Sequence, residues 1–125
     1  MASELILIVD DNAQNLKLAR DVLQFAGFRT IEAGGGMQGV ALALEHRPDL
    51  VLLDIRMPDL SGEEALRHLK EDQRTAAIPV VALTSSTMKG DRERFMSQGF
   101  NGYLEKPISV RDFPDQVRSH LGATS

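Results

Sequence analysis

The stretch LILIVDD at residues 5–11 places two acidic residues directly after five aliphatic ones. The pattern recurs as LVLLD at residues 50–54 and as VVALT at residues 80–84, where threonine replaces the acid. Unbroken aliphatic runs of this length are typical of strands covered on both faces, as in parallel sheets. The three runs therefore predict three buried parallel strands, each followed or ended by a polar side chain.

The segments between these runs have the apolar spacing of helices, for example at Leu16, Ala19 and Leu23. We expect strands at residues 5–9, 28–32, 50–53, 80–83 and 102–104. A helix should follow each strand: one that ends at Gly27, one before Pro48, one after Gly62, and two at residues 92–98 and 109–121. This alternation predicts an α/β domain with a parallel sheet and right-handed crossovers.

The last predicted helix contains a proline at position 114. Proline lacks a backbone donor and clashes with the preceding turn inside a helix. We therefore expect this helix to begin late or to kink, although Ser109 is a suitable N-cap for its start.

Length and composition indicate one globular domain spanning residues 1–125, with 42% hydrophobic and 26% charged residues. The absence of cysteine excludes disulfides and thiolate metal sites. No secretory signal is evident, and no apolar run approaches the ~20 residues of a membrane helix, so we expect a cytoplasmic protein. A net charge of −4 argues against direct binding of nucleic acid.

Polar residues gather at the predicted carboxyl ends of the strands, where such sheets bind ligands. These residues are Asp10, Asp11, Asp54, Thr84 and Lys106. Three neighbouring carboxylates repel one another, and a hard divalent cation with oxygen ligands would neutralise them. The residues therefore predict a Mg²⁺ site.

Phosphoryl transfer is the chemistry that suits this set, because it depends mainly on positioning and charge stabilisation. Asp54 would attack phosphorus in line. Mg²⁺ would hold one phosphoryl oxygen, Lys106 another and Thr84 a third. The small side chain of Ser85, next along the chain, would admit a donor.

The motifs at residues 7–12, 48–58, 78–84 and 102–107, together with Gly62, resemble the receiver domain of bacterial two-component response regulators. The resemblance extends from residue 5 to about residue 121. It implies a flavodoxin-like (βα)5 fold with strand order 2-1-3-4-5. Because few residues follow the last predicted helix, the chain also resembles receivers that stand alone.

The resemblance also implies a role for each site residue. Asp54 resembles the phosphoacceptor. Asp11 resembles a direct Mg²⁺ ligand beside Asp54, with the backbone carbonyl of Arg56 as a third ligand. Asp10 resembles a partner of the metal through water.

The remaining roles concern the phosphoryl group and the signal. Thr84 resembles the switch hydroxyl, and Tyr103 the aromatic side chain that turns inward with it. Lys106 resembles the phosphate-binding lysine, and the Lys106–Pro107 bond is expected to be cis. The face formed by the fourth helix, fifth strand and fifth helix should then change its affinity for a partner.

The implied donor is a histidine kinase or a histidine phosphotransfer protein, and the downstream protein is not identified by sequence. The domain would be a phosphoacceptor with at most self-catalysed phosphorylation and slow autodephosphorylation, rather than an enzyme.

Three alternatives stay open. A small aspartyl-phosphate phosphatase would need a second acid two positions after the nucleophile, where Arg56 stands. A flavin carrier of the same fold would need a phosphate-binding loop where the acidic pair stands. A receiver that binds partners without phosphorylation would not need all three acids, and their presence argues against this alternative.

Overall fold

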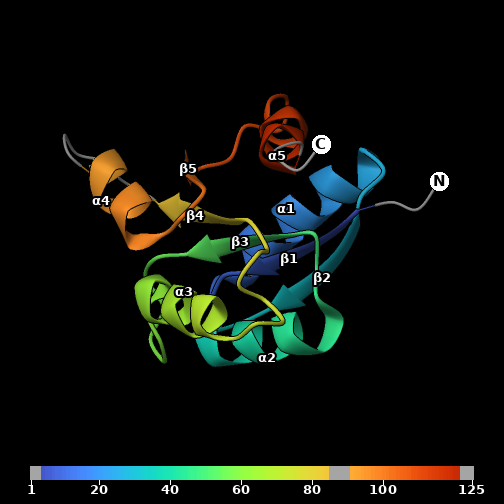
Figure 1. The fold of residues 1–125 in the computed structure, drawn as a ribbon. Coiled ribbons are helices and arrows are strands. Elements are labelled where there is room, and N and C mark those ends of the chain that lie inside the picture. Colours follow the sequence, from blue (N-terminus) through green and yellow to red (C-terminus); the bar gives the residue numbers. More distant parts are fainter. Residues whose placement is uncertain (1–3, 85–90, 122–125) are drawn as a thin grey trace.

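The computed structural model describes residues 4–84 and 91–121. Within them, strands and helices alternate from one end to the other (Figure 1). The strands are β1 (Leu5–Val9), β2 (Arg29–Ala33), β3 (Leu50–Asp54), β4 (Val80–Thr84) and β5 (Gly102–Glu105). The helices are α1 (Ala13–Phe25), α2 (Gly36–His46), α3 (Gly62–Glu71), α4 (Asp91–Gln98) and α5 (Phe113–Leu121).

The strands form one parallel sheet in the order β2-β1-β3-β4-β5. The α/β fold and the strand order expected from the sequence are therefore confirmed. The order reverses beside β1 and β3, which places the ends of these two strands at the switch point where ligands of such sheets bind.

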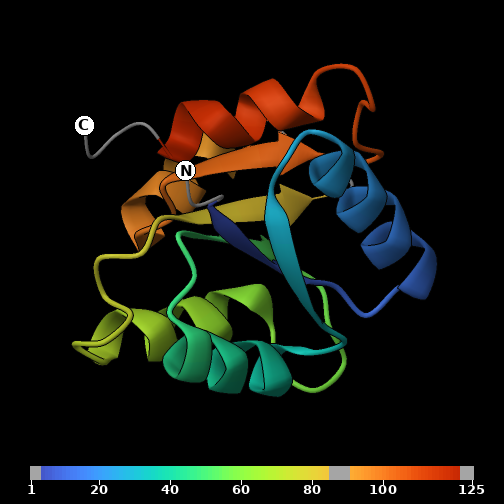
Figure 2. The ribbon, with the colours of Figure 1, turned by 90° about the vertical axis from the view of Figure 1, so that its right-hand side faces the viewer.

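The sheet is the middle of three layers, with helices on both faces (Figure 2). One core cluster joins alternate residues of the strands to α2, α3 and α4, and the other joins the remaining residues to α1 and α5. β1, β3 and β4 are almost wholly buried, which explains why they read as unbroken aliphatic runs.

β2 begins and ends one residue later than expected. The backbone N–H of Phe28 donates to the carbonyl of Leu23 at 3.0 Å, so Phe28 still belongs to the end of α1. Its ring packs in the core between α1 and α5. The strand was predicted to begin at this residue because its side chain is apolar.

α5 begins late, as Pro114 predicted. A turn comes first, in which the Ser109 hydroxyl accepts a hydrogen bond from the Asp112 N–H at 3.2 Å. The helix starts at Phe113, so Pro114 occupies its second position, where no intrahelical donor is needed.

No helix in the described part of the chain is long and apolar enough to cross a membrane.

Candidate functional site

The end of β1 delivers two aspartates with very different surroundings. Asp10 is 1% exposed, whereas Asp11 is exposed to solvent. Asp10 accepts hydrogen bonds from the Asn12 N–H at 2.9 Å and the Asn15 amide at 3.4 Å. Asp10 is thus held within the protein, and Asp11 is the member of the pair that solvent and ligands reach.

The end of β3 places Asp54 beside this pair. Asp54 is 6% exposed, and its carboxylate accepts a hydrogen bond from the Arg56 N–H at 3.3 Å. One carboxylate oxygen from each of Asp10, Asp11 and Asp54 lies within 4.8 Å of the others. The three acids therefore form one cluster, as the sequence predicted.

Lys106 bridges two of these acids from the segment after β5. Its ammonium lies 2.8 Å from Asp10 and 3.2 Å from Asp54. Its backbone N–H donates to the carbonyl of Thr84 at 2.7 Å, so the end of β4 holds the lysine in place. The Lys106–Pro107 peptide is cis, as expected.

The charges of the cluster shift two pKa values. Burial raises the pKa of Asp54, and the negative charge of Asp10 adds to this, although Lys106 acts in the opposite direction. Burial alone would lower the pKa of Lys106. The hydrogen bonds that it donates to Asp10 and Asp54, together with the negative charges of these residues, outweigh the effect of burial and raise this pKa. The site thus holds more negative charge than one ammonium balances, which favours an added cation.

These oxygen ligands fit a small, hard divalent cation. Carboxylates are the ligands that Mg²⁺ takes from proteins, while solvent fills its remaining positions. All three acids contribute an oxygen to the cluster, and Lys106 pairs with two of them, Asp10 and Asp54. A cation here would neutralise the repulsion among the three acids, which Lys106 only partly offsets.

Of the other predicted residues, Thr84 lies near the cluster and Tyr103 lies apart from it. Thr84 is 8% exposed at the end of β4, the neighbour of β3 in the sheet. Tyr103 lies in the middle of β5, with its ring centroid 6.2 Å from that of Phe95 on α4. Ser85, expected to admit a donor, lies outside the described residues.

Two residues that support the acidic cluster were not predicted. The Asn12 side chain accepts hydrogen bonds from the N–H groups of Gln14 and Asn15 and so caps α1. This cap fixes the start of α1, from which Asn15 reaches Asp10. An asparagine directly before a helical pattern is a recognised N-cap signal, so Asn12 was predictable, but the contact of Asn15 was not.

The family of the chain follows from comparison with known proteins. A model of the response regulator receiver domain matches residues 6–118. The chain belongs to this family. It is therefore a receiver domain of a two-component response regulator, a signalling protein rather than an enzyme in the ordinary sense.

The relatives agree with this assignment. The chain is 45% identical to the polar-differentiation response regulator DivK of Brucella anthropi, over 94% of this chain and 95% of that protein. It is similar to the receiver domain of the sensor histidine kinase PA1611 from Pseudomonas aeruginosa, with 32% identity and a TM-score of 0.88, over 98% and 100% of the two chains. That structure has a magnesium ion coordinated in its active-site cleft.

The fold extends to more distant proteins. The chemotaxis protein CheY4 of Vibrio cholerae is 24% identical, with a TM-score of 0.89 over 95% of this chain and 99% of that one. At this identity the likeness concerns the fold alone.

Proposed function

We propose that this receiver domain is a phosphorylation switch in which Asp54 accepts a phosphoryl group from a phosphohistidine. The observation that carries the proposal is the cluster of Asp10, Asp11 and Asp54 at the switch point of the sheet, with Lys106 bonded to two of them. We take residues 1–125 as one such domain.

The reaction is a transfer between two protein side chains. A carboxylate oxygen of Asp54 forms a bond to phosphorus as the bond from phosphorus to the donor imidazole nitrogen breaks, and that nitrogen keeps the electron pair. The ammonium of Lys106, now 3.2 Å from Asp54, would pair with a phosphoryl oxygen. The Thr84 hydroxyl would serve another oxygen.

Mg²⁺ would be held by Asp11, Asp54 and the backbone carbonyl of Arg56, with Asp10 acting through water. Bound there, it supplies positive charge that balances the acids and the transferring phosphoryl group. The PA1611 receiver, with magnesium in its cleft, supports this assignment by likeness.

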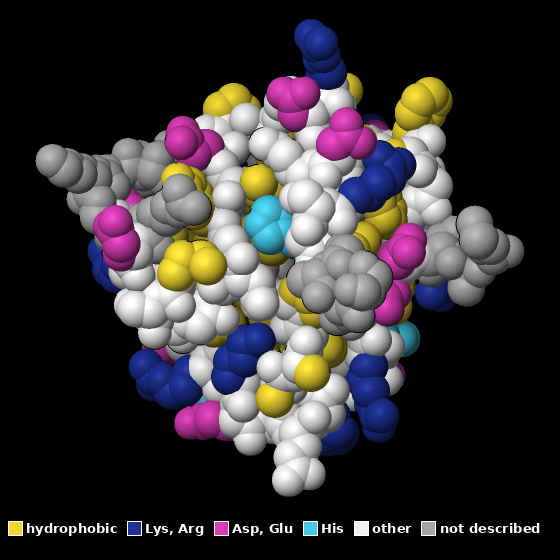
Figure 3. All heavy atoms as spheres, turned by 45° about the horizontal axis from the view of Figure 1, so that its top comes forward, with side chains coloured by type: hydrophobic (Ala, Val, Ile, Leu, Met, Phe, Trp, Pro, Cys, Tyr) yellow, Lys and Arg dark blue, Asp and Glu magenta, His cyan; other side chains and the backbone are white. Residues whose placement is uncertain are grey.

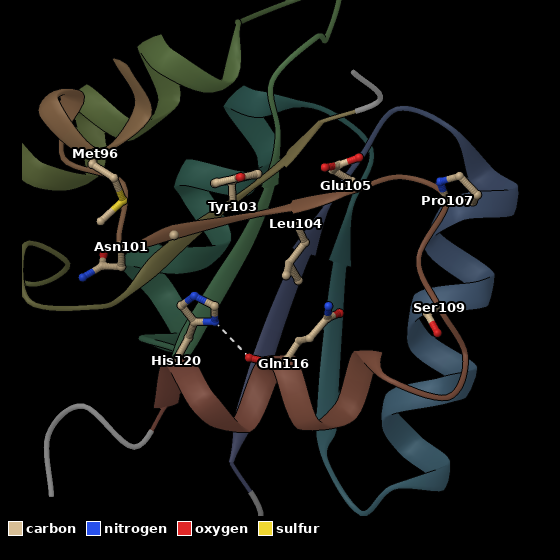
Figure 4. A pocket seen from close by; sticks show the side chains of 10 residues that line it. Met96, Asn101, Tyr103, Leu104, Glu105, Pro107, Ser109, Gln116 and His120 are labelled. Atoms are coloured by element: carbon tan, nitrogen blue, oxygen red, sulfur yellow. Dashed lines mark hydrogen bonds between the residues drawn. The ribbon is translucent and has the colours of Figure 1, made fainter. Parts of the chain in front are cut away.

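Partners follow from the same chemistry. The donor would be a histidine kinase or a histidine phosphotransfer protein in the cytoplasm. The response would reach a downstream protein through α4, β5 and α5. A hollow of about 540 Å³ lies on this face, lined by residues such as Tyr103, Gln116 and His120 (Figure 4).

The character of that face suits a protein partner. Basic, acidic and hydrophobic side chains lie side by side over it (Figure 3). Such a mixture is compatible with a protein partner, whereas nucleic acid requires a basic surface.

Phosphorylation of Asp54 is tested by intact mass after incubation with acetyl phosphate, with and without Mg²⁺. We expect one added phosphoryl group that requires Mg²⁺ and disappears in Asp54→Asn. Asp49→Asn is the matched control, since Asp49 lies directly before β3 while Asp54 ends it. Equal modification of Asp54→Asn and the wild type would refute the assignment.

The switch is tested separately through Tyr103, the only tyrosine in a chain without tryptophan. Its fluorescence therefore reports on this ring alone. We expect phosphorylation to change the emission in the wild type, and to change it much less in Thr84→Ala at an equal extent of phosphorylation, as measured by intact mass. An unchanged emission in fully phosphorylated protein would contradict the switch.

A further inference from the structure

A glycine triplet, Gly34-Gly35-Gly36, precedes α2 and has no part in the site described above. Gly35 is the N-cap residue of α2 and offers no side chain to cap it. The carboxylate of Asp59, from the segment between β3 and α3, supplies the missing acceptor. It receives hydrogen bonds from the N–H groups of Gly36 and Met37, each at 3.1 Å. We call this pair of bonds the Asp59 clasp.

The glycines make room for the clasp. A Cβ atom on Gly35 would lie 3.0 Å from both carboxylate oxygens of Asp59. A Cβ on Gly36 would lie 2.8 Å from the Leu60 carbonyl oxygen and from its Cβ. By contrast, a Cβ on Gly34 would meet only the flexible Gln38 side chain at 3.9 Å. The close approach of the two segments therefore leaves no room for a side chain at Gly36 unless the Leu60 backbone moves, and little room at Gly35.

The clasp is favourable electrostatically as well as geometrically. The first N–H groups of a helix carry partial positive charge, which a carboxylate balances. The hydrogen bonds from Met37 and Gly36 lower the pKa of Asp59, because they stabilise its ionised form.

The segment that Asp59 fixes leads directly from the phosphoacceptor. Its ends are held by bonds from the Ile55 N–H to the Leu83 carbonyl at 3.2 Å and from the Gly62 N–H to the Ile55 carbonyl at 2.9 Å. Between these ends lies Arg56, whose N–H donates to Asp54. Asp59 ties the middle of this loop to a different element, α2.

From this arrangement we propose that Asp59 is a positioning residue for the metal site, holding in place the loop that carries Arg56 beside Asp54. The inference rests on the proposed function, because it concerns the Mg²⁺ ligand set assigned there. Outer groups that orient metal ligands typically change metal affinity by about 10–100-fold when removed.

The first test compares Mg²⁺ affinity in Asp59→Ala and Asp72→Ala by calorimetric titration of the folded proteins. Asp72 is the matched control, since it also accepts a backbone N–H, that of Arg74 at 2.8 Å, in a turn after α3. We expect affinity to fall about tenfold in Asp59→Ala and less than about twofold in Asp72→Ala. Hydrogen exchange at residues 55–60 should accelerate only in Asp59→Ala.

The second test leaves Asp59 in place and alters the glycines. Gly36→Ala should weaken Mg²⁺ binding, because its Cβ forces Leu60 and the clasp apart. Gly34→Ala, which meets no such obstacle, should bind Mg²⁺ as the wild type does. Melting curves identify the temperature at which all four variants are folded.

The outcomes separate the two claims. If the wild type binds Mg²⁺ and Asp59→Ala binds it equally well, Asp59 is only a structural cap and the inference is overturned. If the wild type fails to bind Mg²⁺ at all, the proposed function fails first.

Discussion

The surroundings of Asp54 disfavour its negative charge, although the proposed function requires that charge. It is buried beside Asp10, with Lys106 as a shared counter-charge. Burial and a like charge both disfavour an ionised carboxylate, so the charge of Asp54 is retained at a cost to folding. Such local conflicts are expected at functional sites.

A direct consequence is that Asp54→Asn should stabilise the protein in Mg²⁺-free buffer near neutral pH. Removing the buried charge relieves repulsion with Asp10, which we expect to add on the order of 1 kcal/mol to the free energy of unfolding. Urea denaturation measures this. Glu71→Gln, which removes an exposed charge at the end of α3, should change stability much less. A less stable Asp54→Asn protein would contradict the account.

Asp72 gives the opposite case, an acid stabilised by its partners. Its side-chain and backbone hydrogen bonds with Arg74 lower its pKa from 3.8 to about 2. A carboxyl group with a lowered pKa in the folded state stabilises the fold at pH values above its pKa in the unfolded state. This contribution is lost as the pH falls from about 3.8 toward about 2. Asp72→Asn should therefore be less stable than the wild type near neutral pH, with the difference shrinking over this range. Urea midpoints measured across pH test this.

At the scale of elements, the approach of α3 to β3 depends on a residue with no side chain. A Cβ on Gly62 would overlap the carbonyl oxygen of Asp54 and lie 2.8 Å from the Cα of Ile55. The glycine thus allows the first turn of α3 to lie against β3, the strand that ends in Asp54. Its N–H closes the intervening loop on the Ile55 carbonyl.

Gly62→Ala should consequently destabilise the protein by about 1–3 kcal/mol, because backbone rather than a flexible side chain must move. It should also slow phosphorylation by acetyl phosphate, since Asp54 shifts with its carbonyl. Chemical denaturation and intact mass measure the two effects. Gly34→Ala, with room for a methyl group, is the control. Wild-type stability of Gly62→Ala would show that the turn yields easily.

For the whole molecule, the expected cation should act as a ligand of the folded state alone. Residues from β1 and β3 meet only after folding, so Mg²⁺ binding should raise the melting temperature by mass action. At a concentration one hundred times its dissociation constant, the gain is about 2.7 kcal/mol. Chelation should reverse it.

Asp11→Asn should largely abolish this gain, because Asp11 is the exposed acid of the cluster. Asp21→Asn, on the exposed surface of α1, should retain it. Thermal denaturation with added Mg²⁺ and with chelator provides the comparison. An equal shift in Asp11→Asn and the wild type would place the cation elsewhere.

Much of the architecture could be read from the chain because its signals are local. Aliphatic runs such as those ending at Val9 and Leu53 require burial on both faces, and this alone indicates a parallel sheet. Pro114 and Asn12 mark helix starts through the backbone donors they lack or satisfy. The predicted start of the second strand at Phe28 was wrong, because an apolar side chain can belong either to a strand or to a residue packed at the end of a helix.

By itself, then, the sequence determined the order of the elements and which acids, hydroxyl and lysine stand at strand ends, since periodicity and strand polarity act over few residues. Tertiary structure alone decided that Lys106 pairs with Asp10 as well as Asp54, and that Asp59 caps a helix 22 residues earlier at Met37. Contacts between distant segments depend on how packed layers bring side chains together, which no local pattern encodes.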